Sequence, residues 1–464
     1  MRLIIYRMLI VGLLFFSPAC ACERLPDFGF RPNCLWRCSE HQPKNVIIMI
    51  ADGSGFNHYK SADYYNCGRS PGQYYEFFSV RLAMSTYPYG GSYDPNLAWA
   101  SFDYVDDGYT DSAAAATAMA TGVKTYNAAI GVDVNGNPVL NLVELAEQLG
   151  KSTGVVTTVP FSHATPAGFV AHNPERDDYQ GIAWQMIFDS NTRVIMGCGN
   201  PDYDSDGKRV SYPDYTYVGE SEWAALKNGT AGGDVDGDGI PDHWTLIQTR
   251  AEFQMLAKKG KTPKRVFGVP QVFDTLQQKR SGDASADPYH VPFTQTVPTL
   301  AEMTNAALNV LDNDPNGFFI MIEGGAVDWT AHANESGRLI EEMNDFNKSI
   351  EAVIWWVNTK SSWNDTLVII TADHETGHIT GPGSGQTDQG PVWNTIVNNG
   401  RGKLPGIEWH SGSHTNSLVP FFAKGRGAEQ FRKTIDGKDP LRGPYIDNTD
   451  IANTIFTLWA KRGD

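Results

Sequence analysis

Three apolar segments of strand type end directly at side chains that can bind metal ions. The segments and the residues that follow them are 45–51 (NVIIMIA) with Asp52, 317–322 (GFFIMI) with Glu323, and 366–372 (TLVIITA) with Asp373 and His374. In an open parallel sheet, the carboxyl ends of the strands line the crevice where ligands bind, so polar groups from separate strands converge there. Three such segments in one chain indicate a catalytic centre that contains metal ions.

A second group of metal-binding residues lies outside these strands. Asp328 and His332 are four residues apart, so on a helix both side chains would face one ion. That spacing alone is a weak indication, because it is also common on solvated helix faces, but His414 adds another imidazole. Histidine and carboxylate ligands without cysteine favour zinc at two sites, and an oxygen-rich third site suits magnesium.

A candidate nucleophile precedes an alanine-rich segment. Asp111 and Ser112 stand before 113–120, which is followed by Thr121 and Gly122. Alanine favours a helix, aspartate and serine favour its start, and glycine favours its end. Free N–H groups at a helix start bind phosphate or sulfate and stabilise a nearby alkoxide. In isolation both residues would be ordinary caps, but beside the metal-binding residues Ser112 is predicted to be the nucleophile.

The elements that must position these residues belong to one large α/β domain. The chain has 464 residues, 41% of them hydrophobic, which is enough for an extensive core. Strand-like runs alternate with helix-like segments, and this alternation predicts a mostly parallel central sheet with helices on both faces, a three-layer α/β/α sandwich. We expect a single domain over 45–464, with inserted loop regions at about 200–262 and 377–412. The second insertion is flanked by candidate metal ligands, so we expect it beside the active site.

The N-terminal segment has the features of a secretory signal peptide over residues 1–21. Two arginines precede an apolar stretch that is too short to span a bilayer, and small residues follow it. Residues 22–44 then form an arm that contains proline and cysteine. We expect export to the periplasm or the medium, with lipid attachment at Cys22 or Cys20 as a weaker prediction.

The six cysteines of the chain suit an oxidising compartment. If the first two serve processing or lipid attachment, four remain, an even number. Cys34 and Cys38 are close enough in the sequence to pair, although sequence does not determine the connectivity. A zinc site built on cysteine is the alternative, and it is disfavoured because no second Cys or His pair lies nearby.

With these motifs identified, the sequence resembles the alkaline phosphatases. The matching segments, in the family's order and with its spacings, are 51–53 (ADG), 110–118 (TDSAAAATA), 121–127 (TGVKTYN), 164–166 (ATP), 323–332 (EGGAVDWTAH), 371–374 (TADH) and 414–415 (HT). They span most of the chain after residue 45. The resemblance implies a homodimer that hydrolyses phosphate monoesters through a phosphoserine, with broad specificity for the alcohol.

The resemblance also implies a role for each site residue. Ser112 would be the phosphorylated nucleophile, and Arg176 would hold two phosphate oxygens with its planar guanidinium. The implied metal ligands are Asp328, His332 and His414 for a first zinc, Asp373, His374 and Asp52 for a second, and Asp52, Thr165 and Glu323 for magnesium. Without the resemblance, Arg176 would be interpreted as a solvated surface arginine.

Two positions depart from the best-known enterobacterial pattern of the family. His163 stands where that enzyme has aspartate, and Trp329 stands where it has lysine. Because a cation beside the phosphate is missing, we expect altered magnesium dependence and faster phosphate release. The alternative is that both side chains only pack against their neighbours.

A separate acidic segment has the pattern of a calcium-binding loop. Its carboxylates alternate with glycines and belong to Asp234, Asp236, Asp238 and Asp242. Thr245 stands where such a loop has glutamate. A structural calcium ion is therefore a candidate ligand here, and a solvated acidic turn is the alternative.

Composition and motifs argue against several other functions. The formal net charge is −16 and no basic stripe is present, which argues against a nucleic-acid-binding surface. Sulfatases carry a Cys/Ser-x-Pro-x-Arg motif that is absent, and phosphodiesterases commonly use threonine and lack the arginine, while a metal-dependent phosphomutase is a further alternative. A non-catalytic exported binding protein is disfavoured because the nucleophile and the ligand set are intact.

Overall fold

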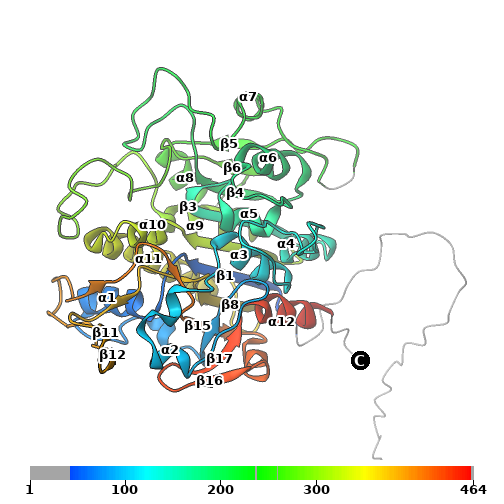
Figure 1. The fold of residues 1–464 in the computed structure, drawn as a ribbon. Helices are drawn as coiled ribbons and strands as arrows, with labels where there is room; N and C mark the ends of the chain where they lie inside the picture. Colours follow the sequence, from blue (N-terminus) through cyan, green and yellow to red (C-terminus); the bar gives the residue numbers. More distant parts are fainter. Residues whose placement is uncertain (1–41, 236–237, 259, 461–464) are drawn as a thin grey trace, which may run out of the picture. The chain divides into compact units, whose positions relative to one another are not determined.

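The computed structural model of the protein describes residues 42–460, except 236, 237 and 259 (Figure 1). Its centre is a sheet of eleven strands. In spatial order the strands are β16 (Gly437–Asp439), β17 (Gly443–Asp447), β2 (Val80–Ser85), β15 (Val419–Gly425), β8 (Thr366–Thr371), β1 (Asn45–Ala51), β7 (Phe318–Gly324), β3 (Ser152–Pro160), β4 (Val194–Cys198), β6 (Val266–Gly268) and β5 (Thr245–Ile247).

Most neighbouring strands of this sheet run parallel. The six pairs from β8 through β1, β7, β3, β4 and β6 to β5 are all parallel, as is β17 with β2. Strand β15 is antiparallel to both of its neighbours, and β16 is antiparallel to β17. The prediction of a large, mostly parallel sheet is therefore confirmed.

Strand β1 illustrates how the sequence produces this architecture. All seven of its residues are buried, because a central parallel strand is covered on both faces. Val46, Ile48 and Ile50 belong to one hydrophobic cluster, while Ile47 and Met49 belong to the other. Successive side chains of a strand point to opposite faces, so the two clusters are the two faces of the sheet.

Helices cover both faces, which confirms the three-layer α/β/α arrangement (Figure 1). One face is covered by α3 (Ser112–Thr121), α4 (Leu142–Gln148), α5 (Ala164–Val170), α6 (Tyr179–Trp184), η3 (Gln185–Asp189), α7 (Glu220–Asn228), η4 (Ala428–Lys433) and α12 (Thr449–Ala460). The other face is covered by α1 (Phe56–Cys67), η1 (Tyr74–Phe77), α8 (Arg250–Leu256), α9 (Leu300–Leu311) and α11 (Ser336–Lys360). The short elements α2 (Leu97–Ala100), η2 (Phe102–Asp106) and α10 (Ala326–His332) complete the helices of the described residues.

The two regions interpreted as insertions contain regular structure. Region 200–262 holds α7, β5 and α8, and β5 forms an edge of the central sheet, so the interpretation of this region as only a loop is wrong. Its many Asp, Gly and Pro residues obscured these short elements. Region 377–412 holds two antiparallel pairs, β10 (Ile379–Thr380) with β13 (Glu408–Trp409) and β11 (Gly385–Thr387) with β12 (Gly390–Val392).

The predicted signal peptide, Cys20, Cys22, Cys34, Cys38 and most of the arm lie outside the described residues. The two cysteines within the described part, Cys67 and Cys198, are free thiols, the first exposed and the second buried. No helix within the described residues combines the length and the apolar composition that crossing a membrane requires.

Candidate metal centre

The predicted ligands converge at the carboxyl edge of four adjacent strands, in the order β8, β1, β7 and β3. Asp52 directly follows β1, and Asp373 and His374 follow β8. Glu323 is the last residue but one of β7, where it pairs in register with Ile50 of β1 and Thr157 of β3. Parallel strands end at a common edge, and for this reason residues more than 300 positions apart lie side by side.

The first group of ligands consists of Asp52, Asp373 and His374, all of them buried. His374 Nε2 lies 3.2 Å from Asp373 Oδ2 and 3.6 Å from Asp52 Oδ1. Asp373 Oδ1 accepts hydrogen bonds from the backbone N–H groups of Gly53 at 3.0 Å and His374 at 2.9 Å. This backbone contact orients the carboxylate, and its other oxygen, Oδ2, faces the group.

Several oxygens of this group are buried without a hydrogen-bond partner among the described residues. They are both carboxylate oxygens of Asp52 and Oδ2 of Asp373. Burial, together with the neighbouring carboxylates of Asp373, Asp328 and Glu323, raises the pKa of Asp52 well above its ordinary value. A buried carboxylate without a partner is costly, so this donor set fits a bound cation.

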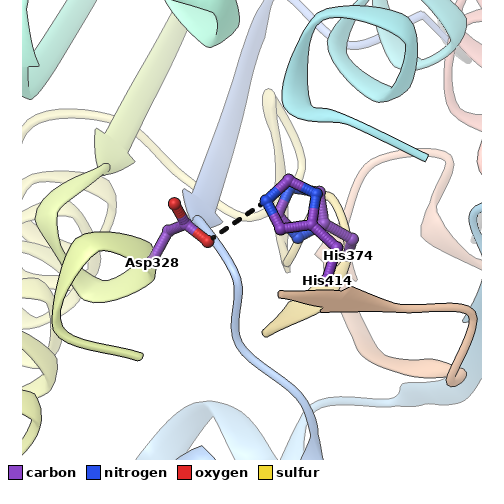
Figure 2. Close-up of side chains that lie close together, drawn as sticks. All are labelled: Asp328, His374 and His414. Carbon is purple, nitrogen blue, oxygen red and sulfur yellow. Dashed lines mark ion pairs between the residues drawn. The ribbon is translucent and has the colours of Figure 1, made fainter. Parts of the chain in front are cut away.

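The second group of ligands comes from α10 and the strand β14 (His414–Thr415). His332 Nε2 lies 3.3 Å from Asp328 Oδ2 and 3.0 Å from His414 Nε2, and His414 Nε2 lies 3.6 Å from Asp328 Oδ1. The helical spacing of Asp328 and His332 thus directs both side chains to one point, as expected. His374 also borders this group, and its ring stacks on that of His414 with the centroids 3.6 Å apart (Figure 2).

Backbone carbonyls orient the imidazoles of the second group. The Nδ1 atom of His332 lies 2.7 Å from the carbonyl oxygen of Gly412, and Nδ1 of His414 lies 2.9 Å from that of Thr110. Because a carbonyl only accepts hydrogen bonds, Nδ1 donates a hydrogen bond in each ring, which leaves Nε2 as the atom that would bind a metal. Sequence analysis missed these contacts, since they join residues that are distant in the chain.

Thr376 is a further residue that sequence analysis missed. Its hydroxyl donates a hydrogen bond of 2.6 Å to Asp328 Oδ1 and lies 3.3 Å from His374 Nδ1. It stands in β9 (Glu375–Thr376), which pairs with β14 so that Thr376 faces His414. Thr376 therefore links the two ligand groups. Its position two residues after His374 was the only indication in the sequence.

The oxygen-rich third set lies beside Asp52. Glu323 Oε1 and Thr165 Oγ1 are buried and lack a hydrogen-bond partner among the described residues, while Glu323 Oε2 accepts a hydrogen bond from the Thr157 hydroxyl. Burial raises the pKa of Glu323 to about 7. Carboxylate and hydroxyl oxygens without nitrogen donors fit a hard cation such as Mg²⁺. Thr157, which orients Glu323, was not predicted.

Ser112 is the first residue of helix α3, as the alanine-rich pattern predicted. Asp111 caps this helix, since its Oδ1 accepts a hydrogen bond of 2.9 Å from the N–H of Ala114. The hydroxyl oxygen of Ser112 lies 3.1 Å from Nε2 of His374. The hydroxyl therefore lies at the start of a ten-residue helix and borders the first ligand group.

Arg176 faces the same cleft as Ser112. The cleft has a volume of about 660 Å³, and Asp328, His332 and His414 also line it. One guanidinium nitrogen of Arg176, Nη1, lies 2.9 Å from Asp111 Oδ2. Asp111 therefore caps the helix of Ser112 with one oxygen and orients Arg176 with the other. From the sequence, Asp111 is expected only to cap the helix.

His163 and Trp329 form an aromatic wall of the cleft. Their ring centroids are 5.6 Å apart in an edge-to-face arrangement, and Tyr179 stacks on His163 at 6.1 Å. Burial lowers the pKa of His163 to about 3, so its imidazole is neutral near pH 7. The structure brings these two residues beside the predicted nucleophile, and they add no positive charge there.

The acidic loop is separate from this cleft. Asp234 accepts hydrogen bonds from the N–H groups of Asp238 at 3.2 Å and Gly239 at 2.7 Å, so its carboxylate organises the turn. Asp242 accepts a hydrogen bond from the N–H of Val235 at 3.2 Å and forms an ion pair of 2.5 Å with Lys264. The fourth carboxylate of the predicted calcium loop, Asp236, lies outside the described residues.

Comparisons with known proteins agree on one family. The model of a family described as alkaline phosphatase matches residues 43–403. Alkaline phosphatase 4 of Bacillus subtilis (strain 168) is 29% identical to the chain over 89% of this chain and 88% of its own length. Alkaline phosphatase H of Pseudomonas aeruginosa (strain UCBPP-PA14) is 32% identical over 72% of this chain and 70% of its own length.

Solved structures give the same result. The alkaline phosphatase from the Antarctic bacterium TAB5 has 26% sequence identity and a TM-score of 0.61, with 91% of this chain and 99% of that chain covered. Thermus thermophilus alkaline phosphatase has a TM-score of 0.64 at 21% identity and covers 91% of this chain and 93% of its own. At that lower identity, the Thermus structure supports the fold alone.

Proposed function

Because the chain belongs to the alkaline phosphatase family, we propose that it hydrolyses phosphate monoesters through a phosphoserine at Ser112 and releases inorganic phosphate. Phosphate-monoester hydrolysis is the activity of this family. The observation that carries the proposal is the distance of 3.1 Å between the Ser112 hydroxyl and His374 Nε2, at the start of α3 and inside the cleft. A hydroxyl in that position is at once near metal ligands and near the N–H groups that bind a phosphoryl anion.

The proposed metals are two zinc ions and one magnesium ion. Asp328, His332 and His414 would hold the first zinc, and Asp52, Asp373 and His374 the second. Asp52, Glu323 and Thr165 would hold magnesium. The donor chemistry supports this division, because imidazoles occur in the first two sets and only oxygens in the third. A related structure of a TAB5 alkaline phosphatase variant has Mg bound in its M3 site.

When bound, two zinc ions would polarise the phosphoryl group and stabilise the entering and leaving oxygens of the displacement. In the first step, Ser112 Oγ gives up its proton and forms a bond to phosphorus, while the bond from phosphorus to the alcohol oxygen breaks. The alcohol takes up a proton and leaves. In the second step, the oxygen of water gives up a proton and forms a bond to phosphorus, the bond to Ser112 Oγ breaks, Ser112 Oγ takes up a proton, and phosphate leaves.

The charge on the phosphoryl oxygens would be held by Arg176 and by the start of α3. The guanidinium of Arg176 is oriented by Asp111 and offers a planar pair of donors to two oxygens. The backbone N–H groups of the first turn of α3 add the positive end of the helix dipole. Both groups are positioned before substrate binds, which is the condition for electrostatic stabilisation of the transition state.

The decisive experiment measures hydrolysis of 4-nitrophenyl phosphate by the purified protein with and without EDTA, together with its zinc and magnesium content. We expect metal-dependent turnover, and we expect Ser112→Ala to lower kcat by about a thousandfold or more, as loss of a nucleophile does. The matched control is Ser54→Ala, a buried serine whose hydroxyl contacts Met343. Absence of metal-dependent turnover in the wild-type protein would favour a binding protein, and faster hydrolysis of bis(4-nitrophenyl) phosphate would favour a diesterase.

We further propose a single catalytic domain over 45–464 that is exported, cleaved after the signal peptide at 1–21, and assembled as a homodimer. Mass spectrometry of the mature N-terminus would test cleavage and the lipid anchor at Cys22 or Cys20. Light scattering of the purified protein would test the dimer. A monomer in solution, or an uncleaved N-terminus in the exported fraction, would contradict the corresponding proposal.

Calcium in the acidic loop is a separate proposal. It is supported by the alternating carboxylates at Asp234, Asp238 and Asp242 and by the turn that Asp234 organises. Structural calcium would raise the thermal unfolding midpoint without changing turnover. The test is a calcium titration of the wild-type protein and of Asp238→Asn in a thermal unfolding experiment. An equal response of the two proteins would contradict the site.

A further inference from the structure

Lys279 is a second cation of the catalytic cleft, and no motif in the sequence points to it. Among the described residues that line the cleft, only Arg176 and Lys279 are lysine or arginine. The ammonium nitrogen of Lys279 lies 5.6 Å from the centroid of the Trp329 ring, on the wall of the cleft. Lys279 is exposed, so its charge is accessible to a ligand.

The two cations differ in how their charge is compensated. Arg176 forms an ion pair with Asp111, and its side chain is 18% exposed. Lys279 forms no ion pair with a carboxylate of the described residues. Its contact with the aromatic face of Trp329 leaves the full positive charge available to a ligand. Arg176 is thus built into the phosphoryl pocket, whereas Lys279 offers an uncompensated charge outside it.

The backbone on both sides of Lys279 is anchored. The buried guanidinium of Arg338 donates hydrogen bonds to the carbonyl oxygens of Gln278 and Arg280, the second at 3.0 Å. Arg280 in turn forms a buried ion pair of 2.7 Å with Glu341. Arg338 and Glu341 belong to α11, which follows the metal-binding helix α10. The helix that follows the candidate metal ligands therefore fixes the backbone on both sides of Lys279.

The position of Lys279 indicates what its charge would contact. The transferred phosphoryl group must lie beside Ser112, whereas the ammonium group lies over the ring of Trp329, another residue that lines the cleft. The alcohol part of a substrate would extend from the phosphoryl group toward the open side. A lysine is a compact charge on a flexible stem, so it suits anionic groups in varied positions. The net charge of −16 disfavours the approach of substrates with additional negative charge, and a local cation offsets this effect.

We propose that Lys279 gives the enzyme a preference for phosphomonoesters whose alcohol part carries its own anionic group, such as a carboxylate or a second phosphate. The proposal rests on the proposed phosphomonoesterase function and deepens it by naming a substrate class. It assigns Lys279 to the leaving group and leaves the phosphoryl group to Arg176. In the structural alternative, Lys279 only covers the face of Trp329 and has no effect on substrate choice.

A matched pair of substrates separates these alternatives. Phenyl phosphate and 4-carboxyphenyl phosphate differ by one carboxylate on the alcohol part. For Lys279→Gln we expect kcat/KM for 4-carboxyphenyl phosphate to fall by about three- to tenfold, the range for one charge pair near a protein surface. The kcat/KM for phenyl phosphate should change by less than about twofold, because its alcohol part carries no charge for Lys279 to contact. Lys279→Arg should restore the preference, because it restores the charge.

The control variant is Lys360→Gln, which removes the same charge from an exposed position at the far end of α11. Lys360 lies about 36 Å from the first residue of α11, as calculated from the rise per residue of an α-helix. We expect no change in the ratio of the two kcat/KM values. The preference of the wild-type enzyme should also weaken as salt is added, whereas the ratio for Lys279→Gln should respond less to salt.

Two outcomes would overturn the inference about Lys279. One is an equal fall of kcat/KM for both substrates in Lys279→Gln, which would assign the lysine to the phosphoryl group or to folding. The other is no change for either substrate, which would leave Lys279 with a packing role. Failure of the wild-type protein to hydrolyse phenyl phosphate is a different result, because it would contradict the proposed function itself.

Discussion

Two groups of buried charged side chains in this molecule differ in how their charge is compensated. At the metal centre, carboxylate oxygens are buried without a partner among the described residues. The second group, the ionic cluster, contains both signs of charge, and its members are Arg280, Arg338, Glu341 and Glu342. Arg280 and Glu341 form an ion pair, while Oε1 of Glu342 and Nε of Arg338 have no hydrogen-bond partner among the described residues. Glu341 accepts from Arg280 at 2.7 Å and also accepts from the backbone N–H of Tyr289 at 2.6 Å.

This difference indicates that the buried charges of the ionic cluster serve the fold, whereas those of the metal centre serve function. A buried pair whose hydrogen bonds are satisfied holds segments of the chain together. A set of acidic and imidazole groups that converges without an internal counter-charge needs an external ion, and such sets mark functional sites. The ionic cluster should therefore be sensitive in stability experiments, and the metal centre in activity and metal-binding experiments.

The strongest test of this contrast breaks the ionic cluster. Arg280→Ala leaves the buried carboxylate of Glu341 unpaired, and we expect a loss of about 3–5 kcal/mol in the free energy of unfolding. Urea unfolding measures it, while kcat of the folded fraction should change little. The control is Arg432→Ala, whose partner Glu429 is 59% exposed, and which should cost less than about 1 kcal/mol. Similar losses for both variants would contradict the structural role of the cluster.

Glu342 provides a pH-dependent test of the same cluster. Burial and the neighbouring carboxylates raise its pKa to about 8 in the folded protein. Because the folded state binds this proton more tightly than the unfolded state, Glu342 destabilises the protein as pH rises from about 4.5 to 8. The slope is at most about 1.4 kcal/mol per pH unit.

Glu342→Gln should remove this slope, so the variant should become progressively more stable than the wild type between pH 5 and pH 8. Urea unfolding at several pH values measures the difference. Glu429→Gln, an exposed carboxylate, should leave the slope unchanged. A wild-type stability that rises over this pH interval in step with Glu342→Gln would contradict the raised pKa.

Substitution of Asp52 at the metal centre should lower activity when metal is present and raise stability when metal is absent. Asp52→Asn removes a proposed ligand, so with zinc present we expect a fall in kcat of about a hundredfold or more. In EDTA, the same variant should be more stable than the wild type by about 1–3 kcal/mol, because it replaces a buried carboxylate that lacks a partner by a neutral amide. Thermal unfolding with zinc and with EDTA measures the pair of effects. Destabilisation under both conditions would mean that Asp52 serves the fold and not a metal.

The smallest expected effect comes from substitutions of Trp329 and His163 in the aromatic wall of the cleft. Trp329→Lys restores the cation that the enterobacterial pattern has at this position, and His163→Asp restores the carboxylate. We expect Trp329→Lys to lower the inhibition constant of phosphate by up to about tenfold, the value of one favourable charge pair. His163→Asp should change the magnesium dependence of the rate. Inhibition constants that stay unchanged in both variants would leave the two aromatic residues with packing roles alone.

Much of the fold and of the candidate site was predictable because its information is local. The apolar run of β1 predicts a buried central strand and directs attention to Asp52 at its end. The spacing of Asp328 and His332 predicts one face of α10. The alanine-rich run predicts α3 and the location of Ser112 at its start. Each of these inferences needs only the geometry of one strand or one helix.

The remaining features depend on contacts between segments that are far apart in the chain. The carbonyl groups that orient His332 and His414, the hydroxyl of Thr376 on Asp328, and the placement of Lys279 over Trp329 leave no pattern in the sequence. The short strand β5 was hidden in a polar region for the same reason, since its place at the sheet edge comes from pairing with β6.

By itself, then, the sequence determined which side chains stand at the ends of which elements, because helix and strand periodicity act over a few residues. Only the tertiary structure decided which groups orient the candidate ligands, which charges compensate one another and which cations line the cleft. Hydrogen bonds and ion pairs act over a few ångströms in space, and residues that are hundreds of positions apart reach that distance only after the sheet has assembled.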